Sequence, residues 1–135
     1  MAVEPRWLTL DEVLGIQVHQ VARFGGLAGV KDMGLVESAV TSPRNLWHYE
    51  GVEDLVTLAA RYAVAIPRNH GFNDGNKRTG WAGLLVFLEL NGYAFEWPDE
   101  ITPALWVESC VEKKTSEAEF IEFLAAHIIE LDVQK

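Results

Sequence analysis

The sequence predicts an all-α fold, and three observations carry that prediction. Apolar residues recur at helical spacing in several separate segments. Two of these segments open with Thr or Ser followed three residues later by Glu, the spacing of a capping box. One segment, residues 76–90, is apolar around most of its circumference. We therefore expect a single domain over residues 1–135, in which helices surround one buried central helix.

Composition narrows the classes of protein. With 135 residues, 49% of them hydrophobic, the chain can bury a core. Its net charge of −9 argues against nucleic acid as a direct partner, although a small basic pocket for one nucleotide stays open. No apolar run suits a bilayer, the N-terminus does not read as a secretory signal, and the single cysteine, Cys110, fits a reducing compartment. We expect a cytoplasmic protein without a membrane partner.

The first half of the chain offers clear helix boundaries. Thr9 and Glu12 predict a helix that starts at Leu10 and stops at the glycine pair 25–26. The glycine-rich stretch 25–34 predicts a loop. The segment "LVESAV", residues 35–40, predicts a short helix that ends before Pro43.

The middle of the chain predicts an amphipathic helix followed by a very apolar one. A helical pattern runs from Glu53, and Pro67 should kink or end it. The central helix follows over residues 76–90, with Asn91 and Gly92 as its C-terminal signal.

The last third predicts a short extended piece, "YAFEWPDE", at residues 93–100. Asp99 or Thr102 then opens a helix through Glu112. Ser116 opens the last helix, whose expected apolar stripe comprises Phe120, Ile121, Leu124, Ile128 and Leu131.

The polar stretch "NHGFNDGNKRTG", residues 69–80, connects two apolar segments and leads into the central helix. A helix N-terminus presents backbone N–H groups without partners, together with partial positive charge. Gly75 lets a ligand approach the backbone, and Asn76, Lys77 and Arg78 add donors and two charges. The pattern favours an anion site, with phosphate as the natural ligand.

Two further residues of this stretch add reactive chemistry. His70 can accept a proton near neutral pH, and Asp74 can bind a divalent cation. Each also has a purely structural interpretation, His70 as a hydrogen-bonding residue at a helix end and Asp74 as the cap of the next helix. Phe72 is interpreted as a core residue that anchors the loop. His19, His48 and His127 show no metal-ligand spacing and are interpreted as structural.

The segment "HGFNDGNKR", residues 70–78, resembles the signature of the Fic/Doc family, HxFx[DN][AG]N[GK]R. The stretches "RFGGLAGVKDMG" and "LELNGY" are similar to the death-on-curing (Doc) branch of that family. The resemblance implies a Fic/Doc-type helical bundle.

The resemblance also implies roles for the motif residues. His70 would be the base that deprotonates a target hydroxyl, and Asp74 would hold Mg²⁺ against the phosphates of ATP. Phosphate binding is implied for Gly75, Asn76 and Arg78. Three positions depart from the pattern: Gly71 is expected to loosen the loop, Gly75 is the residue usual in AMP transferases, and Pro67 bears on how His70 is aimed.

Lys77 carries the branch assignment. AMP-transferring members have Gly after the motif Asn, whereas the Doc branch has Lys, which fills the anion site. Resemblance to Doc implies a toxin that transfers the terminal phosphate of ATP to a threonine of elongation factor Tu and so blocks translation. Three alternatives stay open: an AMP transferase, a non-catalytic anion-binding module, and a nuclease, the last disfavoured because the chain lacks a basic surface.

The sequence contains no inhibitory motif of its own, which indicates that a separate partner regulates the protein. The inhibitory pattern of many Fic proteins, [ST]xxxE[GN], has no match here, and the nearest segment is "TSEAEF", residues 115–120. Resemblance to Doc implies a Phd-type antitoxin that folds as a helix into an apolar groove. The candidate groove residues are Trp7, Trp47, Trp97 and Trp106.

Overall fold

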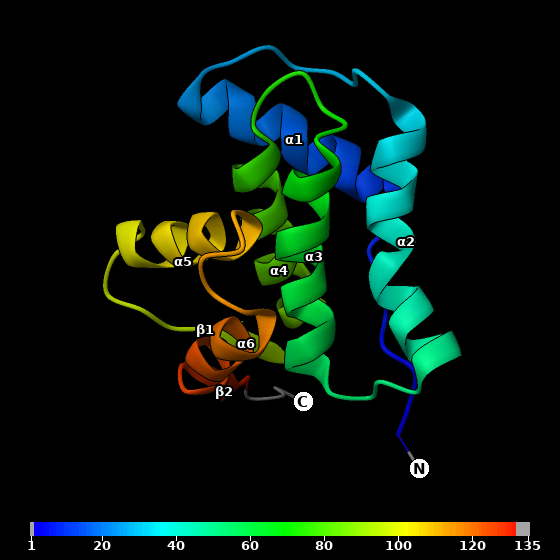
Figure 1. Ribbon diagram of the computed structural model, residues 1–135, viewed down its shortest axis with the longest axis vertical. Helices are drawn as coiled ribbons and strands as arrows, with labels where there is room; N and C mark the ends of the chain where they lie inside the picture. The colour runs from blue at the N-terminus through cyan, green and yellow to red at the C-terminus, as the bar shows by residue number, and fades with distance from the viewer. Residues whose placement is uncertain (1, 132–135) are drawn as a thin grey trace.

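The computed structural model describes residues 2–131, and this part of the chain forms six helices and one two-stranded sheet (Figure 1). The all-α prediction is confirmed. The elements are α1 (Leu10–Phe24), α2 (Met33–Glu50), α3 (Leu55–Asn69), α4 (Asn76–Leu90), β1 (Tyr93–Phe95), α5 (Ile101–Val111), α6 (Glu117–Ala125) and β2 (Ile128–Glu130).

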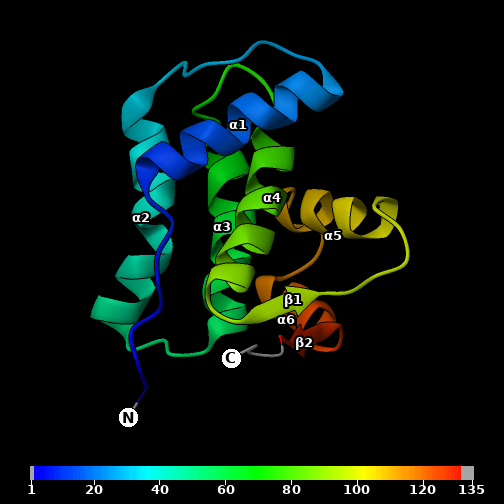
Figure 2. The same ribbon diagram turned by 180° about the vertical axis from the view of Figure 1, so that it is seen from behind.

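Two helices, α3 and α4, lie side by side at the centre of the molecule. Figures 1 and 2 show α2 along one side of this pair, α5 and α6 along the other, and α1 crossing one end. The prediction of a buried helix at residues 76–90 is confirmed, but α3 shares the centre with it. One side of α4 lines a cleft, so Trp81 and Leu85 remain half-exposed, while Leu84, Phe87 and Leu88 on the same helix are buried.

The central pair packs closely at one point. A side-chain Cβ built on Gly80 of α4 would lie 2.8 Å from the carbonyl oxygen of Ala63 and 2.8 Å from Cδ of Pro67. Pro67 has no N–H, so the carbonyl of Ala63 lacks its usual i+4 donor, and the glycine lets α4 approach that carbonyl. Helix α3 continues past Pro67 to Asn69, so the proline sits within the last turn at the contact between the two helices.

Helix α2 corrects a sequence prediction. We expected a short helix that ends before Pro43, but α2 runs from Met33 to Glu50 with Pro43 inside it. A proline within a helix costs about 3 kcal/mol. Burial of Val36, Val40 and Leu46, on both sides of the proline, offsets that cost.

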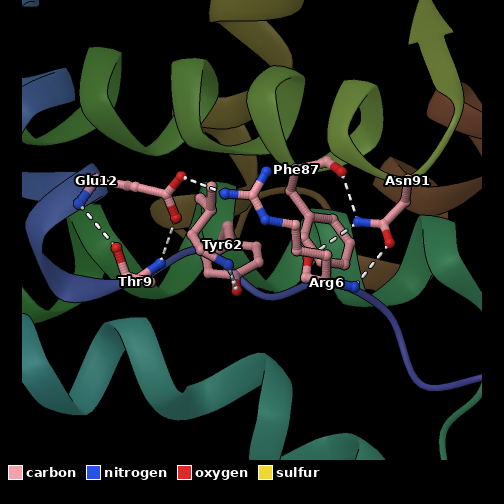
Figure 3. Close-up of polar contacts among 7 residues, drawn as sticks. Arg6, Thr9, Glu12, Tyr62, Phe87 and Asn91 are labelled. Carbon is pink, nitrogen blue, oxygen red and sulfur yellow. Dashed lines mark hydrogen bonds and ion pairs between the residues drawn. The ribbon is translucent and has the colours of Figure 1, made fainter.

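The segment before α1 is tied to both central helices, as Figure 3 shows. The N–H of Leu8 donates to the hydroxyl of Tyr62 in α3 at 3.1 Å. The side chain of Asn91, just after α4, accepts from the N–H of Arg6 at 2.8 Å and donates to its carbonyl at 3.0 Å. Thr9 and Glu12 then form the predicted capping box, so α1 begins at a fixed place.

The C-terminal third is partly as predicted. Asp99 accepts the N–H groups of Ile101 and Thr102 at the start of α5, although the N-cap position itself is Glu100, one residue after the first of the two expected caps. The capping box at Ser116 is also present.

The final apolar stripe is corrected. Helix α6 ends at Ala125, and Ile128 lies in β2, which pairs antiparallel with β1 in the register Phe95↔Ile128. The extended piece predicted at residues 93–100 is thus the short strand β1 and an irregular segment after it. Residues 128–130 form a strand instead of continuing the helix, because the edge of β1 offers their backbone groups hydrogen-bond partners.

Candidate functional site

The loop between α3 and α4, residues 70–75, opens onto a cleft of about 850 Å³. We call this segment the motif loop. One wall of the cleft is the end of α1 and the first turns of α4, and the other is α5. Its lining includes Phe24, His70, Arg78, Trp81 and Leu105. The cleft therefore joins a polar end, where the motif lies, to an apolar end.

The N-terminus of α4 faces this cleft without a side-chain cap. Gly75 is the N-cap residue, in the left-handed backbone region at φ 72°, and no side chain accepts from the first turn. The interpretation of Asp74 as the helix cap is therefore wrong. An added Cβ at Gly75 would lie 3.2 Å from Val21 of α1. Both the positive φ and this contact favour glycine at position 75. Because glycine has no side chain and no other side chain caps this helix, the N-terminus of α4 is open to an anion.

Asn76 is buried and fixes the motif loop. Its Oδ1 accepts from the N–H of Phe72 at 3.1 Å, and its Nδ2 donates to the carbonyl of Phe72 at 3.2 Å. These two bonds set the orientation of the amide, so Nδ2 also faces Nδ1 of His70, at 3.3 Å. Nδ1 is then the accepting nitrogen, and a neutral His70 in this arrangement carries its proton on Nε2. Phe72 is buried, as predicted.

His70 is exposed to the cleft and stands at the C-terminus of α3. Its backbone is left-handed, with φ 52° and ψ 45°, which is uncommon for a residue other than glycine. Its N–H donates to the carbonyl of Ile66 at 3.2 Å, and so closes the last turn of α3. The end of α3 thus directs the imidazole toward the N-terminus of α4.

Asp74 is exposed, and one of its oxygens is already engaged. Oδ2 accepts from the N–H of Leu27 at 2.7 Å, in the loop after α1. In residues 2–131 no group of three His, Cys, Asp or Glu side chains is arranged to hold a metal. A magnesium ion would therefore depend on one carboxylate and on phosphate oxygens, which is a common arrangement for this ion. The single carboxylate beside an open helix N-terminus fits such a group.

Three cations surround the polar end of the cleft. Lys77 lies 3.8 Å from Glu108 of α5, in a half-exposed pair. Arg78 lies over the ring of Phe24, its guanidinium 4.4 Å from the centroid, and makes no ion pair with a described residue. Arg23 lies over the same ring at 4.8 Å and also pairs with Glu100 at 3.6 Å.

Sequence reasoning missed Phe24 and Arg23 as site residues. The signal was an aromatic and a basic residue at the end of the first helix, directly before the glycine pair.

Gly71 makes the motif loop tight, which corrects the expectation of a looser loop. An added Cβ would lie 2.7 Å from Cγ2 of Val36, at the start of α2. The carbonyl of Gly71 accepts the N–H groups of Lys31 and Asp32, at 2.8 and 3.0 Å. Glycine is present because the start of α2 packs directly on the loop.

The remaining singled-out residues lie outside the polar end. Trp7 is buried against Phe87, and Trp47 and Trp106 are half-buried in aromatic contacts; of the four tryptophans proposed as a docking surface, only Trp97 lines the cleft. His48 pairs with Glu4, and His127 contacts the carbonyl of Phe123, so both have structural partners. Cys110 is buried, and burial raises the pKa of its thiol. No helix within residues 2–131 has the length and apolarity to cross a membrane.

Fold and site together define a helical domain that places a histidine, one carboxylate and an open helix N-terminus in a single cleft. Comparison with known proteins assigns the family. The model of the Fic/DOC family matches residues 7–88, so the chain belongs to the Fic/Doc family.

Two curated relatives carry Doc names. The chain is 36% identical to "Protein kinase doc" of Escherichia phage P1 over 95 residues, which are 70% of this chain and 75% of that protein. It is 40% identical to "Toxin Doc" of Mycolicibacterium smegmatis over 70 residues, which are 51% of this chain and 54% of that protein.

Proposed function

We propose that the chain is a toxin kinase that transfers the terminal phosphate of ATP to a threonine hydroxyl of elongation factor Tu. One observation carries the proposal: His70, Asp74 and the open N-terminus of α4 meet in one cleft of a Fic/Doc chain. Similarity to a relative named as a kinase and to another named as a toxin supports it. The proposed target implies that the protein acts in the cytoplasm.

Each motif residue has a role in this reaction. The N-terminus of α4, with Gly75, Asn76 and the cations Lys77 and Arg78, would bind the phosphates. Asp74 would hold Mg²⁺, which supplies charge neutralisation at the phosphates. His70 would take the proton of the threonine hydroxyl as its oxygen bonds to the γ phosphorus. The bond from that phosphorus to the β–γ bridging oxygen breaks, and ADP leaves.

The contact of His70 with Asn76 supports Nδ1 as the nitrogen that would act as the base. The lone pair of a neutral His70 lies on Nδ1, and the bond to Asn76 that occupies it is long, at 3.3 Å. A hydroxyl that approaches Nδ1 would replace this bond. Catalytic hydrogen bonds are often loose in proteins without substrate, so the arrangement is compatible with a base.

AMP transfer is the second candidate, and Gly75 was the residue in its favour. The left-handed backbone at this position accounts for glycine by itself, at φ 72°. Lys77 lies in the first turn of α4 and is paired with Glu108. It therefore occupies space next to the proposed phosphate site. The first observation removes the argument that Gly75 gave for AMP transfer, and the position of Lys77 supports terminal phosphate transfer.

Labelled ATP separates these candidates. We expect purified elongation factor Tu to gain label from γ-labelled ATP and none from α-labelled ATP. Label from the α position would replace the kinase by an AMP transferase. Binding of ATP without transfer of either label would favour a non-catalytic anion-binding module. His70→Ala protein is the matched control, because it lacks the proposed base and retains the phosphate-binding residues.

The apolar end of the cleft suits the proposed Phd-type antitoxin. Ile101 and Leu105 of α5 line the cleft and are 71% and 60% exposed. A disordered segment that folds into a helix there would bury these side chains. We expect the chain alone to arrest bacterial growth, and its His70→Ala variant to be tolerated. Unaffected growth and translation, in cells that contain the folded wild-type chain and no partner, would contradict the toxin assignment.

A further inference from the structure

Gln17 is a buried polar residue whose position the proposed mechanism does not explain. It lies within α1, between Val13 and Val21 on the face that packs against the core, and is 1% exposed. A glutamine in an apolar stripe costs free energy unless its amide is hydrogen-bonded. Its partners should therefore show why it is there.

The amide of Gln17 joins two loops that are distant in sequence. Its Nε2 donates to the carbonyl of Asp74 at 3.0 Å and, more weakly, to that of Leu27 at 3.3 Å. Its Oε1 accepts from the N–H of Gly29 at 3.1 Å. We call residues 25–29 the glycine loop. One side chain thus holds the glycine loop against the last residue before the N-terminus of α4.

The glycine loop in turn holds the carboxylate of Asp74. The N–H of Leu27 donates to Oδ2 of Asp74 at 2.7 Å. The loop lies directly on this residue, because a Cβ added to Gly26 would be 2.9 Å from Cβ of Asp74. The backbone carbonyl of Asp74 is therefore fixed by Gln17 itself, and its carboxylate by a loop that Gln17 fixes.

We infer that Gln17 is a positioning residue that sets the carboxylate of Asp74 for a magnesium ion bound with nucleotide phosphate. This inference rests on the proposed function, since it concerns the metal-binding role proposed for Asp74. Partners behind a metal ligand commonly change metal affinity by about 10- to 100-fold when they are removed. A single-carboxylate site depends on such partners because no second protein ligand corrects its orientation.

The test compares two buried substitutions on the same helix. Gln17→Met keeps the size of the side chain and removes all three hydrogen bonds. Val13→Ala is the control, because Val13 is also buried in α1 and contacts the core without a bond to either loop. Both variants lose stability, so all measurements are made well below their unfolding temperatures.

Two readouts separate positioning from a merely structural role. In calorimetric titrations with ATP, the Mg²⁺ concentration that supports half-maximal binding should rise about 10-fold for Gln17→Met and stay unchanged for Val13→Ala. Amide hydrogen exchange at Leu27 and Gly29 should accelerate in Gln17→Met relative to the α1 amides, and not in Val13→Ala. If Gln17→Met does not fold, Gln17→Asn replaces it, since it keeps a buried amide and withdraws it by one methylene.

The outcomes also distinguish this inference from the proposed function. A wild-type chain that binds ATP with Mg²⁺ but transfers no phosphate would overturn the proposed kinase and leave the role of Gln17 intact. A folded Gln17 variant with a normal Mg²⁺ requirement overturns the inference, whatever the reaction. A wild-type chain whose ATP binding is independent of Mg²⁺ overturns it as well.

Discussion

His70 has a backbone conformation that a side chain with a Cβ adopts at a cost. Its left-handed φ of 52° lets α3 end and lets the chain turn at once toward α4. The N–H bond to Ile66 and the amide of Asn76 hold it in place. Strain of this kind costs roughly 1–3 kcal/mol and concentrates at functional sites. At this position, then, the proposed chemistry requires a histidine side chain, whereas the backbone conformation favours glycine.

Replacing His70 separates these two demands. His70→Ala and His70→Gly should both lower phosphate transfer by about 10²- to 10⁴-fold, because each removes the proposed base. The glycine variant should be more stable than the alanine variant by about 1 kcal/mol, because glycine adopts positive φ without steric cost. Transfer rates and thermal unfolding measure the two effects. Near-normal transfer by either variant would remove His70 from the mechanism.

Lys77 allows a test of which group of ATP is transferred, the terminal phosphate or AMP. Lys77→Gly removes the charge beside the open N-terminus of α4 and frees its space. We expect weaker transfer of the terminal phosphate and a gain of AMP transfer, measured by the mass added to the target protein. Glu108→Gln is the control, since it breaks the same ion pair and leaves the lysine in place. Unchanged phosphate transfer by Lys77→Gly would show that another residue decides between phosphate transfer and AMP transfer.

At the scale of elements, the site depends on how closely α3 and α4 approach each other. The motif loop joins these two helices, so their separation sets the distance between His70 and the N-terminus of α4. Gly80 permits the contact with Ala63 and Pro67. The start of α2 and the glycine loop then fix the outer side of the motif loop, through Gly71 and Asp74.

Substitution of Gly80 tests the role of this close contact. Gly80→Ala should destabilise the protein by roughly 1–3 kcal/mol, because its Cβ would lie 2.8 Å from atoms of α3. Gly15→Ala is the matched control: it also lies within a helix, but its Cβ meets nothing within 4 Å. There alanine should stabilise by about 0.5–1 kcal/mol. Chemical denaturation measures both, and equal effects would show that the contact does not limit the packing.

At the scale of the whole molecule, Tyr62 connects the core to the segment before α1. It is fully buried, contacts Phe87 and accepts the N–H of Leu8. Burial raises its pKa to about 12. The unfolded chain deprotonates a tyrosine near pH 10. The folded state therefore keeps a proton that the unfolded state loses above that pH, and the stability falls as pH rises from about 10 to about 12.

Tyr62→Phe tests this pH dependence. The wild type should lose up to about 2.7 kcal/mol of unfolding free energy across that interval through this group, at about 1.36 kcal/mol per pKa unit. The variant should lack this component, so its stability should fall less steeply above pH 10. At neutral pH it should be weaker by about 1–3 kcal/mol, because the N–H of Leu8 stays buried without a partner. Urea unfolding at pH 8 and pH 11 measures the difference, and parallel losses in both proteins would contradict the assignment.

Features that depend on neighbours along the chain were determined by the sequence itself. The capping boxes at Thr9 and Ser116, the bounds of α4 and the placement of the motif at its N-terminus all follow from such local signals. The family signature lies within nine consecutive residues, 70–78, so it too could be identified from the sequence without the structure.

Tertiary contacts decided the rest, because distant segments supply the energy or the space. Helix α2 continues through Pro43 because its flanking residues pack on the core, and the chain end leaves helical form because β1 offers it an edge. Position 71 is a glycine because the start of α2 packs against it, and Gln17 is a glutamine because it hydrogen-bonds to two loops that are distant in sequence from each other. The hydrogen bonds within a helix or a cap join residues that are close in sequence, so the local pattern predicts them. The partners of a buried polar side chain, and the atoms that leave no room for a Cβ, are brought into place only when the helices pack.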